Sequence, residues 1–157
     1  MENKIIVTLD ETQGKKFNIA GGDYRIIISG KETNGNFAVI EMSVPPGAGP
    51  NPHSHPDFNE SFYVLEGEVS FKSELGNYIA KKNSYVNIPQ AGLVHGFKNR
   101  SDKPAKLLCT VTPAGLEDFF EEVAGFLEAN QKTDVSEKMN SISQKYGQTL
   151  YPENYLD

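Results

Sequence analysis

The sequence of 157 residues contains little cysteine or histidine and no tryptophan. It has one cysteine and three histidines. A disulfide within the chain needs two cysteines, so Cys109 cannot form one. Its position in the apolar run 107–111 predicts a buried, inert thiol, which fits a reducing, cytoplasmic compartment. Long apolar stretches are also lacking, and the first ten residues do not resemble a secretion signal. We therefore expect no membrane partner.

An excess of positive charge is also missing. The 15 Lys and Arg residues are outnumbered by 21 Asp and Glu residues, which gives a formal net charge of -6. Nucleic acids and anionic membranes bind basic faces, whereas the lysines here are scattered among carboxylates. This distribution excludes nucleic acid as an expected partner. The length suits a single domain with its own core, since no shift in composition marks a boundary between two domains.

Residues 4–112 contain short runs of β-forming residues separated by Gly, Pro and Asn clusters, which predicts an all-β sandwich or barrel. The expected strands cover residues 5–9, 24–28, 37–44, 60–71, 78–81, 85–88, 95–99 and 105–111. Asn34 and Gly35 tolerate positive φ and predict a hairpin turn. The prolines of segment 45–52 lack backbone donors, so this segment is predicted to be a stiff loop that leads to His53.

The apolar period changes to helical spacing after residue 112. Apolar residues from Leu116 to Leu127 predict an amphipathic helix, with Thr112 and Pro113 as its cap and first turn. Glu117 is expected on its solvated side. Residues 135–146 form a weaker helical candidate, and 151–155 are irregular. We expect a β-barrel over 1–112 and a helical appendage over 113–157, in the same domain, which packs on the barrel or on a partner subunit.

The three histidines fall into one pattern with a glutamate: His53, His55, Glu60 and His95. In an extended backbone, side chains at i and i+2 point the same way, so His53 and His55 share a face if they lie on a strand. Imidazole nitrogen and carboxylate oxygen are ligands that zinc and first-row transition metals accept. The pattern therefore predicts a metal site.

Alternation along the strands also predicts which side chains accompany these ligands. Phe62 and Val64 share the face of Glu60, and Phe97 shares the face of His95. Met42 and Tyr85 are further candidates, although the facing of their strands cannot be fixed from the sequence. Apolar walls around a few polar groups are typical of a small-molecule pocket. The same residues would also suit a barrel core that holds no ligand.

The spacing of these residues resembles the motifs of the cupin superfamily. The first cupin motif is matched throughout by Gly47, His53, His55, Glu60 and Gly67. The second is matched by Pro89, His95 and Asn99, while Asn83 stands in place of a glycine and the segment 89–92 has one extra residue. Segments 62–67 and 112–121 are similar to those of single-domain bacterial cupins that resemble quercetin 2,3-dioxygenases.

This resemblance implies a jelly-roll barrel, also called a double-stranded β-helix, with C-terminal α-helices and often a homodimer. It also implies one divalent transition metal (Fe, Mn, Ni, Co, Cu or Zn) held by His53, His55, Glu60 and His95, with Glu60 as a candidate catalytic base. The expected function is the metal-dependent binding of a small phenolic or enolic ligand, with a quercetinase-like dioxygenase as the leading activity. A non-oxidative isomerase or lyase and a non-catalytic binding protein are the alternatives.

Overall fold

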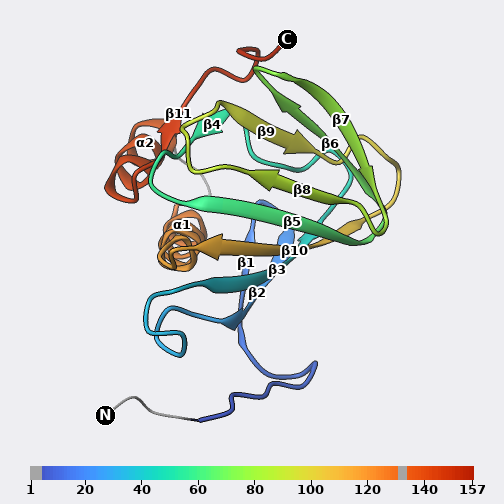
Figure 1. Ribbon diagram of the computed structural model, residues 1–157. Helices are drawn as coiled ribbons and strands as arrows, with labels where there is room; N and C mark the ends of the chain where they lie inside the picture. Colours follow the sequence, from blue (N-terminus) through green and yellow to red (C-terminus); the bar gives the residue numbers. More distant parts are fainter. Residues whose placement is uncertain (1–4, 131–133) are drawn as a thin grey trace.

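The computed structural model describes residues 5–130 and 134–157, which form two antiparallel β-sheets and two C-terminal helices (Figure 1). The six-stranded sheet has the order β1 (Lys15–Ile19), β2 (Gly22–Ile28), β3 (Ala38–Val44), β10 (Ala105–Thr112), β5 (Asn59–Glu66), β8 (Tyr85–Ile88). The five-stranded sheet has the order β11 (Thr149–Leu150), β4 (His53–Ser54), β9 (His95–Lys98), β6 (Glu68–Ser73), β7 (Gly76–Lys81). The predicted β-rich fold is therefore present, with the C-terminal strand β11 returning to the second sheet.

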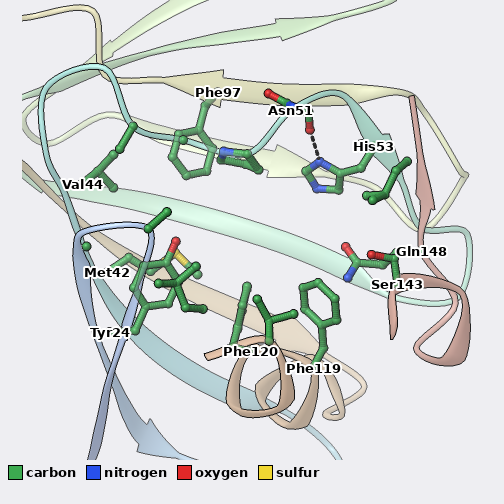
Figure 2. Close-up of a pocket in the computed structure, with 18 of the residues that line it drawn as sticks. Tyr24, Met42, Val44, Asn51, His53, Phe97, Phe119, Phe120, Ser143 and Gln148 are labelled. Carbon is green, nitrogen blue, oxygen red and sulfur yellow. Dashed lines mark hydrogen bonds between the residues drawn. The ribbon is translucent and has the colours of Figure 1, made fainter. Parts of the chain in front are cut away.

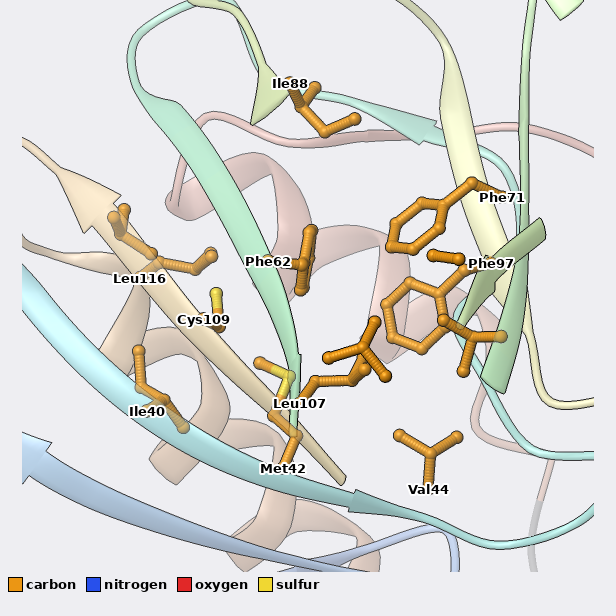
Figure 3. Packing of buried hydrophobic residues seen from close by; sticks show 14 of the residues in the cluster. Ile40, Met42, Val44, Phe62, Phe71, Ile88, Phe97, Leu107, Cys109 and Leu116 are labelled. Atoms are coloured by element: carbon orange, nitrogen blue, oxygen red, sulfur yellow. The ribbon is translucent and has the colours of Figure 1, made fainter. Parts of the chain in front are cut away.

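The hydrophobic core draws on both sheets (Figure 3). Strands β3 and β10 lie side by side, and every second residue of each is buried, as the period of two requires. Phe62 of the first sheet packs on Phe71 and Phe97 of the second, with ring centroids 5.3 and 5.4 Å away. Such aromatic contacts fix the two sheets relative to one another, and burial of each ring stabilises the fold by about 1.5–3 kcal/mol.

Helix α1 (Leu116–Ala129) packs against β1 and β3. Its N-cap is Gly115, so the predicted start at Thr112 and Pro113 is wrong by a few residues. Glu117 is only 4% exposed and accepts hydrogen bonds from the backbone N–H groups of Gly30 (2.8 Å) and Gly115 (2.7 Å). The expectation that Glu117 faces solvent is thus also wrong, because its carboxylate accepts hydrogen bonds from the N-cap of α1 and from the loop after β2 and so joins the two.

Helix α2 (Ser136–Lys145) is tied to α1 and leads into β11. Glu122 of α1 accepts hydrogen bonds from Lys145 Nζ (2.7 Å) and Tyr146 Oη (2.6 Å). Strand β11 then pairs with β4, with Leu150 opposite His53. Residues 1–4 and 131–133, which belong to the predicted barrel and appendage ranges, lie outside the described residues.

Two expectations about strands are wrong. Residues 5–9 form no strand, and Ile5 and Ile6 are 69% and 90% exposed. Their β-branched side chains favour extended backbone, but no neighbouring strand pairs with them; the ladder uses 15–19 instead. The run 60–71 is divided at Gly67, whose φ of 71° turns the chain from the first sheet to the second.

Within the described ranges, no helix is long and apolar enough to cross a membrane.

Candidate metal centre

The four predicted ligands lie together at the edge of the core. His53 on β4 is paired in register with His95 on β9, His55 follows β4 directly, and Glu60 lies on β5 of the other sheet. All four side chains are buried, between 1% and 9% exposed. One ligand atom from each residue lies within 4.8 Å of the others. Strand pairing thus brings His95 to residues that precede it by a long stretch of chain.

The distances between the ligand atoms suit a common ion. His55 Nε2 lies 3.1 Å from both Glu60 Oε2 and His95 Nε2, and His95 Nε2 lies 3.7 Å from Glu60 Oε2. Two ligands bound about 2.1 Å from one metal ion, at right angles to each other, lie about 3.0 Å apart. The observed separations are therefore those of neighbouring ligands of one ion.

Backbone carbonyl groups orient the three imidazole rings. The Nδ1 atoms of His53 and His95 each lie 2.8 Å from a carbonyl oxygen, of Asn51 and Leu93 respectively. His55 Nδ1 lies 3.3 Å from the carbonyl of Phe58, and its ring stacks on the Phe58 ring. Because a carbonyl only accepts hydrogen bonds, these contacts favour the proton on Nδ1 and leave Nε2 available as a metal ligand.

The chemistry of this donor set fits a cation. With the protons on Nδ1, the Nε2 lone pairs of His55 and His95 point at each other across 3.1 Å in a buried site. Two acceptors at that distance repel each other unless a proton or a metal ion lies between them. The four residues therefore fit a divalent transition metal, and the sequence alone could not reveal the carbonyl groups that orient them.

Burial and neighbouring groups shift the pKa values of two of the candidate ligands, His53 and Glu60. Burial, reinforced by the neighbouring His95, lowers the pKa of His53 to about 4, so its imidazole is neutral at pH 7. Burial alone would raise the pKa of Glu60, but the imidazoles of His55 and His95 outweigh it and hold this pKa below its usual range. Glu60 is therefore an ionised carboxylate, as a metal ligand must be.

Cys109 contacts the other oxygen of the same carboxylate. Its Sγ donates a hydrogen bond to Glu60 Oε1 at 3.3 Å, and burial raises the pKa of the thiol well above its ordinary value. Cys109 is buried, as the sequence predicts. Its contact with Glu60, which directs Oε2 towards the histidines, was not foreseen, because nothing in the sequence indicates which buried residue the thiol meets.

A cavity of about 470 Å³ opens beside the ligands and is lined in part by His53, Glu60 and His95 (Figure 2). Three of the predicted wall residues line it: Met42, Phe62 and Phe97. Its size lies in the range of pockets that hold small organic molecules.

The other two predicted wall residues lie elsewhere. Val64 is fully buried in the core but does not line this cavity. Tyr85 is 61% exposed and lies outside the cavity, so its assignment to the wall is corrected. The physical reason is the register of β8, which places Tyr85 opposite Tyr63 on the outer side of the sheet.

Several lining residues were missed by the sequence reasoning. Tyr24, Phe119 and Phe120 contribute aromatic surface, and Ser143 and Gln148 contribute polar groups (Figure 2). Phe119 and Phe120 lie in the apolar stripe that predicts an amphipathic helix, and such a stripe does not distinguish core residues from residues that line a cavity. No motif marks Ser143 or Gln148, so their position depends on how the C-terminal segment folds back.

Comparison with known proteins relates this chain to a family. Residues 40–111 match the cupin domain family. This segment is therefore similar to cupin domains. The chain is 26% identical over 112 residues to quercetin 2,3-dioxygenase from Bacillus subtilis, a match that covers 71% of the chain and 33% of that protein. The chain therefore spans about a third of the length of this relative, and the resemblance found in the sequence is confirmed.

Solved structures share this fold. One is a sugar phosphate isomerase of the cupin superfamily from Silicibacter pomeroyi, with a TM-score of 0.58 and 23% identity over 68% of this chain and 75% of that chain. Another is the polyketide cyclase RemF from Streptomyces resistomycificus, with a TM-score of 0.61 and 21% identity over 69% and 80%. These two proteins are named for different activities, so the shared fold does not by itself indicate which reaction is catalysed.

Proposed function

We propose that this protein binds one divalent transition metal and a small phenolic or enolic ligand beside it, and that it oxidises this ligand with dioxygen. The observation that carries the proposal is the meeting of three imidazoles and a carboxylate, of which His53, Glu60 and His95 lie at the wall of a mostly apolar cavity. The similarity to quercetin 2,3-dioxygenase supports dioxygenase activity over other cupin reactions. We also propose that the two sheets close into a jelly-roll barrel and that the protein is a homodimer.

His53, His55, Glu60 and His95 would hold the metal ion. When bound, such an ion supplies Lewis acidity and, if it is redox-active, electron transfer to dioxygen. Iron, manganese, nickel, cobalt, copper and zinc all accept this set of ligands, so the ion is left open.

The residues of the chain would provide the remaining functions. Glu60 is ionised and lines the cavity, so it is placed to accept the proton of a phenolic or enolic hydroxyl group. Met42, Phe62 and Phe97 offer apolar surface that excludes water and orients a flat ligand. Together these groups would bind the ligand, remove its proton and keep the reacting atoms dry.

Two measurements test this proposal. Elemental analysis of protein purified without chelator should find about one metal ion per chain, and the double variant His53→Ala/His55→Ala should lose it. Oxygen uptake with a panel of flavonols and diketones should then be seen with the native protein and with Tyr85→Ala, an exposed control, but not with Glu60→Ala.

The same assay separates the alternatives. Product formed at an unchanged rate without oxygen would refute the dioxygenase and favour a metal-dependent isomerase or lyase. Binding of the ligand without any turnover would favour a non-catalytic binding protein. Equal metal content in the native protein and the double histidine variant would refute the metal site itself.

A further inference from the structure

Two polar side chains of the C-terminal segment point at the cavity without a partner. Ser143 Oγ and Gln148 Nε2 are buried and make no hydrogen bond with any of the residues that the structure describes. Ser143 is 0% and Gln148 5% exposed, and both line the cavity beside the metal centre. Buried polar atoms are almost always hydrogen-bonded, because losing water without a replacement destabilises the fold. Two buried polar atoms without hydrogen-bond partners at a cavity wall therefore indicate a ligand that enters the cavity.

The end of helix α2 fixes these two residues next to each other. The backbone N–H of Gln148 donates to the carbonyl of Ser143 (2.9 Å), and that of Gly147 donates to Gln144 (3.1 Å), with Gly147 at a φ of 74°. This is a Schellman motif, in which the two side chains at the positions of Ser143 and Gln148 commonly make a hydrophobic contact. Here both are polar, which is the opposite of what stability alone would favour.

Contacts on both sides hold this turn at the metal centre. Tyr146, which precedes Gly147, donates a hydrogen bond to Glu122 of α1 (2.6 Å). After Gln148, strand β11 pairs with β4 and places Leu150 opposite the metal ligand His53. Figure 2 accordingly shows Ser143 and Gln148 on the same side of the cavity as His53, with Tyr24 and Met42 on the other side.

The side chains of Ser143 and Gln148 are suited to bind an oxygen atom of a ligand. An amide N–H donates a hydrogen bond, and a serine hydroxyl donates or accepts one, so together they suit a carbonyl or hydroxyl oxygen of the ligand. Within the described residues, no Lys or Arg lines the cavity. A phosphate or carboxylate bound away from the metal would therefore lack a counter-charge. The remaining walls are mainly apolar and aromatic.

We propose that Ser143 and Gln148 determine ligand specificity by binding an oxygen substituent of a neutral, largely apolar ligand whose other oxygen atoms face the metal ligands. The inference rests on the proposed function and narrows it to a class of substrate. Neutral polyphenols with oxygen substituents on more than one ring belong to this class, and sugar phosphates and dicarboxylates do not.

The test compares two flavonols that share the 3-hydroxyl and 4-carbonyl oxygen atoms. Quercetin carries hydroxyl groups on its outer rings, and 3-hydroxyflavone lacks them. Their dissociation constants are measured by fluorescence titration with the metal-loaded native protein and with Ser143→Ala/Gln148→Leu. The matched control, Ser141→Ala/Gln144→Leu, makes the same changes at exposed positions of α2 that do not line the cavity. If the first double variant fails to fold, Gln148→Met replaces it.

We expect the first double variant to bind quercetin about 10- to 100-fold more weakly, since it loses up to two hydrogen bonds, and 3-hydroxyflavone within about threefold of native. Its melting temperature should equal or exceed that of the native protein, because the unpaired polar atoms are gone. The control should resemble the native protein in all three measurements.

Other outcomes overturn the proposal. An equal loss for both flavonols, or no loss for either, would show that the pair does not bind the outer oxygen. A failure of both flavonols to bind the native protein, or tighter binding of glucose 6-phosphate, would refute the class of ligand. The metal content of the same samples tests the proposed function separately, so loss of the metal and loss of this discrimination can be told apart.

Discussion

Removal of the metal with a chelator should lower the stability of the native protein by a predictable amount. The four ligands meet only when β4 pairs with β9 and the two sheets pack, so the ion binds the folded chain far better than the unfolded chain. For one site at a free ion concentration of 100 times the dissociation constant, the free energy of unfolding rises by about 2.7 kcal/mol. In a chain of 157 residues this corresponds to a melting temperature about 5–11 °C higher.

The assay is thermal unfolding followed by circular dichroism, first with excess chelator and then with increasing free zinc or manganese. Each tenfold increase in free ion above the dissociation constant should add about 1.4 kcal/mol. The double variant His53→Ala/His55→Ala supplies the control, because it removes two of the four ligands and should melt at a temperature that the ion does not change.

Two results would refute this reasoning. A native protein that melts at the same temperature with chelator and with saturating ion would show that the four residues hold no metal. An equal increase in the native protein and in the double histidine variant would show that the ion binds elsewhere.

Three further predictions concern single residues of the site and core. In the metal-free protein, burial lowers the pKa of His53 from 6.5 to about 4, so the unfolded chain takes up a proton first. About 3 kcal/mol of stability should therefore be lost as the pH falls from about 7 to 4, and a flat profile in urea unfolding would contradict this. Cys109→Ala removes the hydrogen-bond donor to Glu60 and should weaken metal binding about tenfold in a chelator competition, whereas Cys109→Ser should restore it to within about threefold; three equal affinities would refute this positioning role. Phe62→Ala, at a residue 2% exposed, should lower the free energy of unfolding by about 3–5 kcal/mol in urea, against less than about 1 kcal/mol for exposed Tyr85→Ala; a similar loss for both would contradict the packing argument.

Patterns with a regular period could be predicted reliably. The β-forming runs at 37–44 and 105–111 correspond to β3 and β10, and the apolar spacing of 116–127 corresponds to α1. In each case many residues report the same secondary structure, so one atypical residue does not obscure the signal. The segment 5–9 shows the limit of this reasoning, because β-branched residues favour an extended backbone but cannot supply the neighbouring strand that a sheet requires.

The four candidate ligands were identified for a similar reason. Histidine is rare in this chain, and the spacing of the three histidines and one glutamate matches a motif, so the sequence alone assigned His53, His55, Glu60 and His95 to one site. The wall of the cavity was only partly predicted. Met42 and Phe62 were placed correctly against it, whereas Tyr85 was not, because the facing of a short strand depends on its register with a neighbour.

The sequence by itself determined the resemblance to cupins, the main strands and first helix, and the residue types at the candidate metal centre. Only the tertiary structure decided what surrounds these ligands: the carbonyl groups behind the imidazoles, the Cys109 thiol on Glu60, and the approach of Ser143 and Gln148 from the C-terminal end. Cys109, Ser143 and Gln148 lie far from the ligands in the chain, so only strand pairing and packing bring them to the site. The carbonyl groups are two or three residues from their histidines, but their direction depends on the backbone conformation of the fold, which the residue pattern does not give.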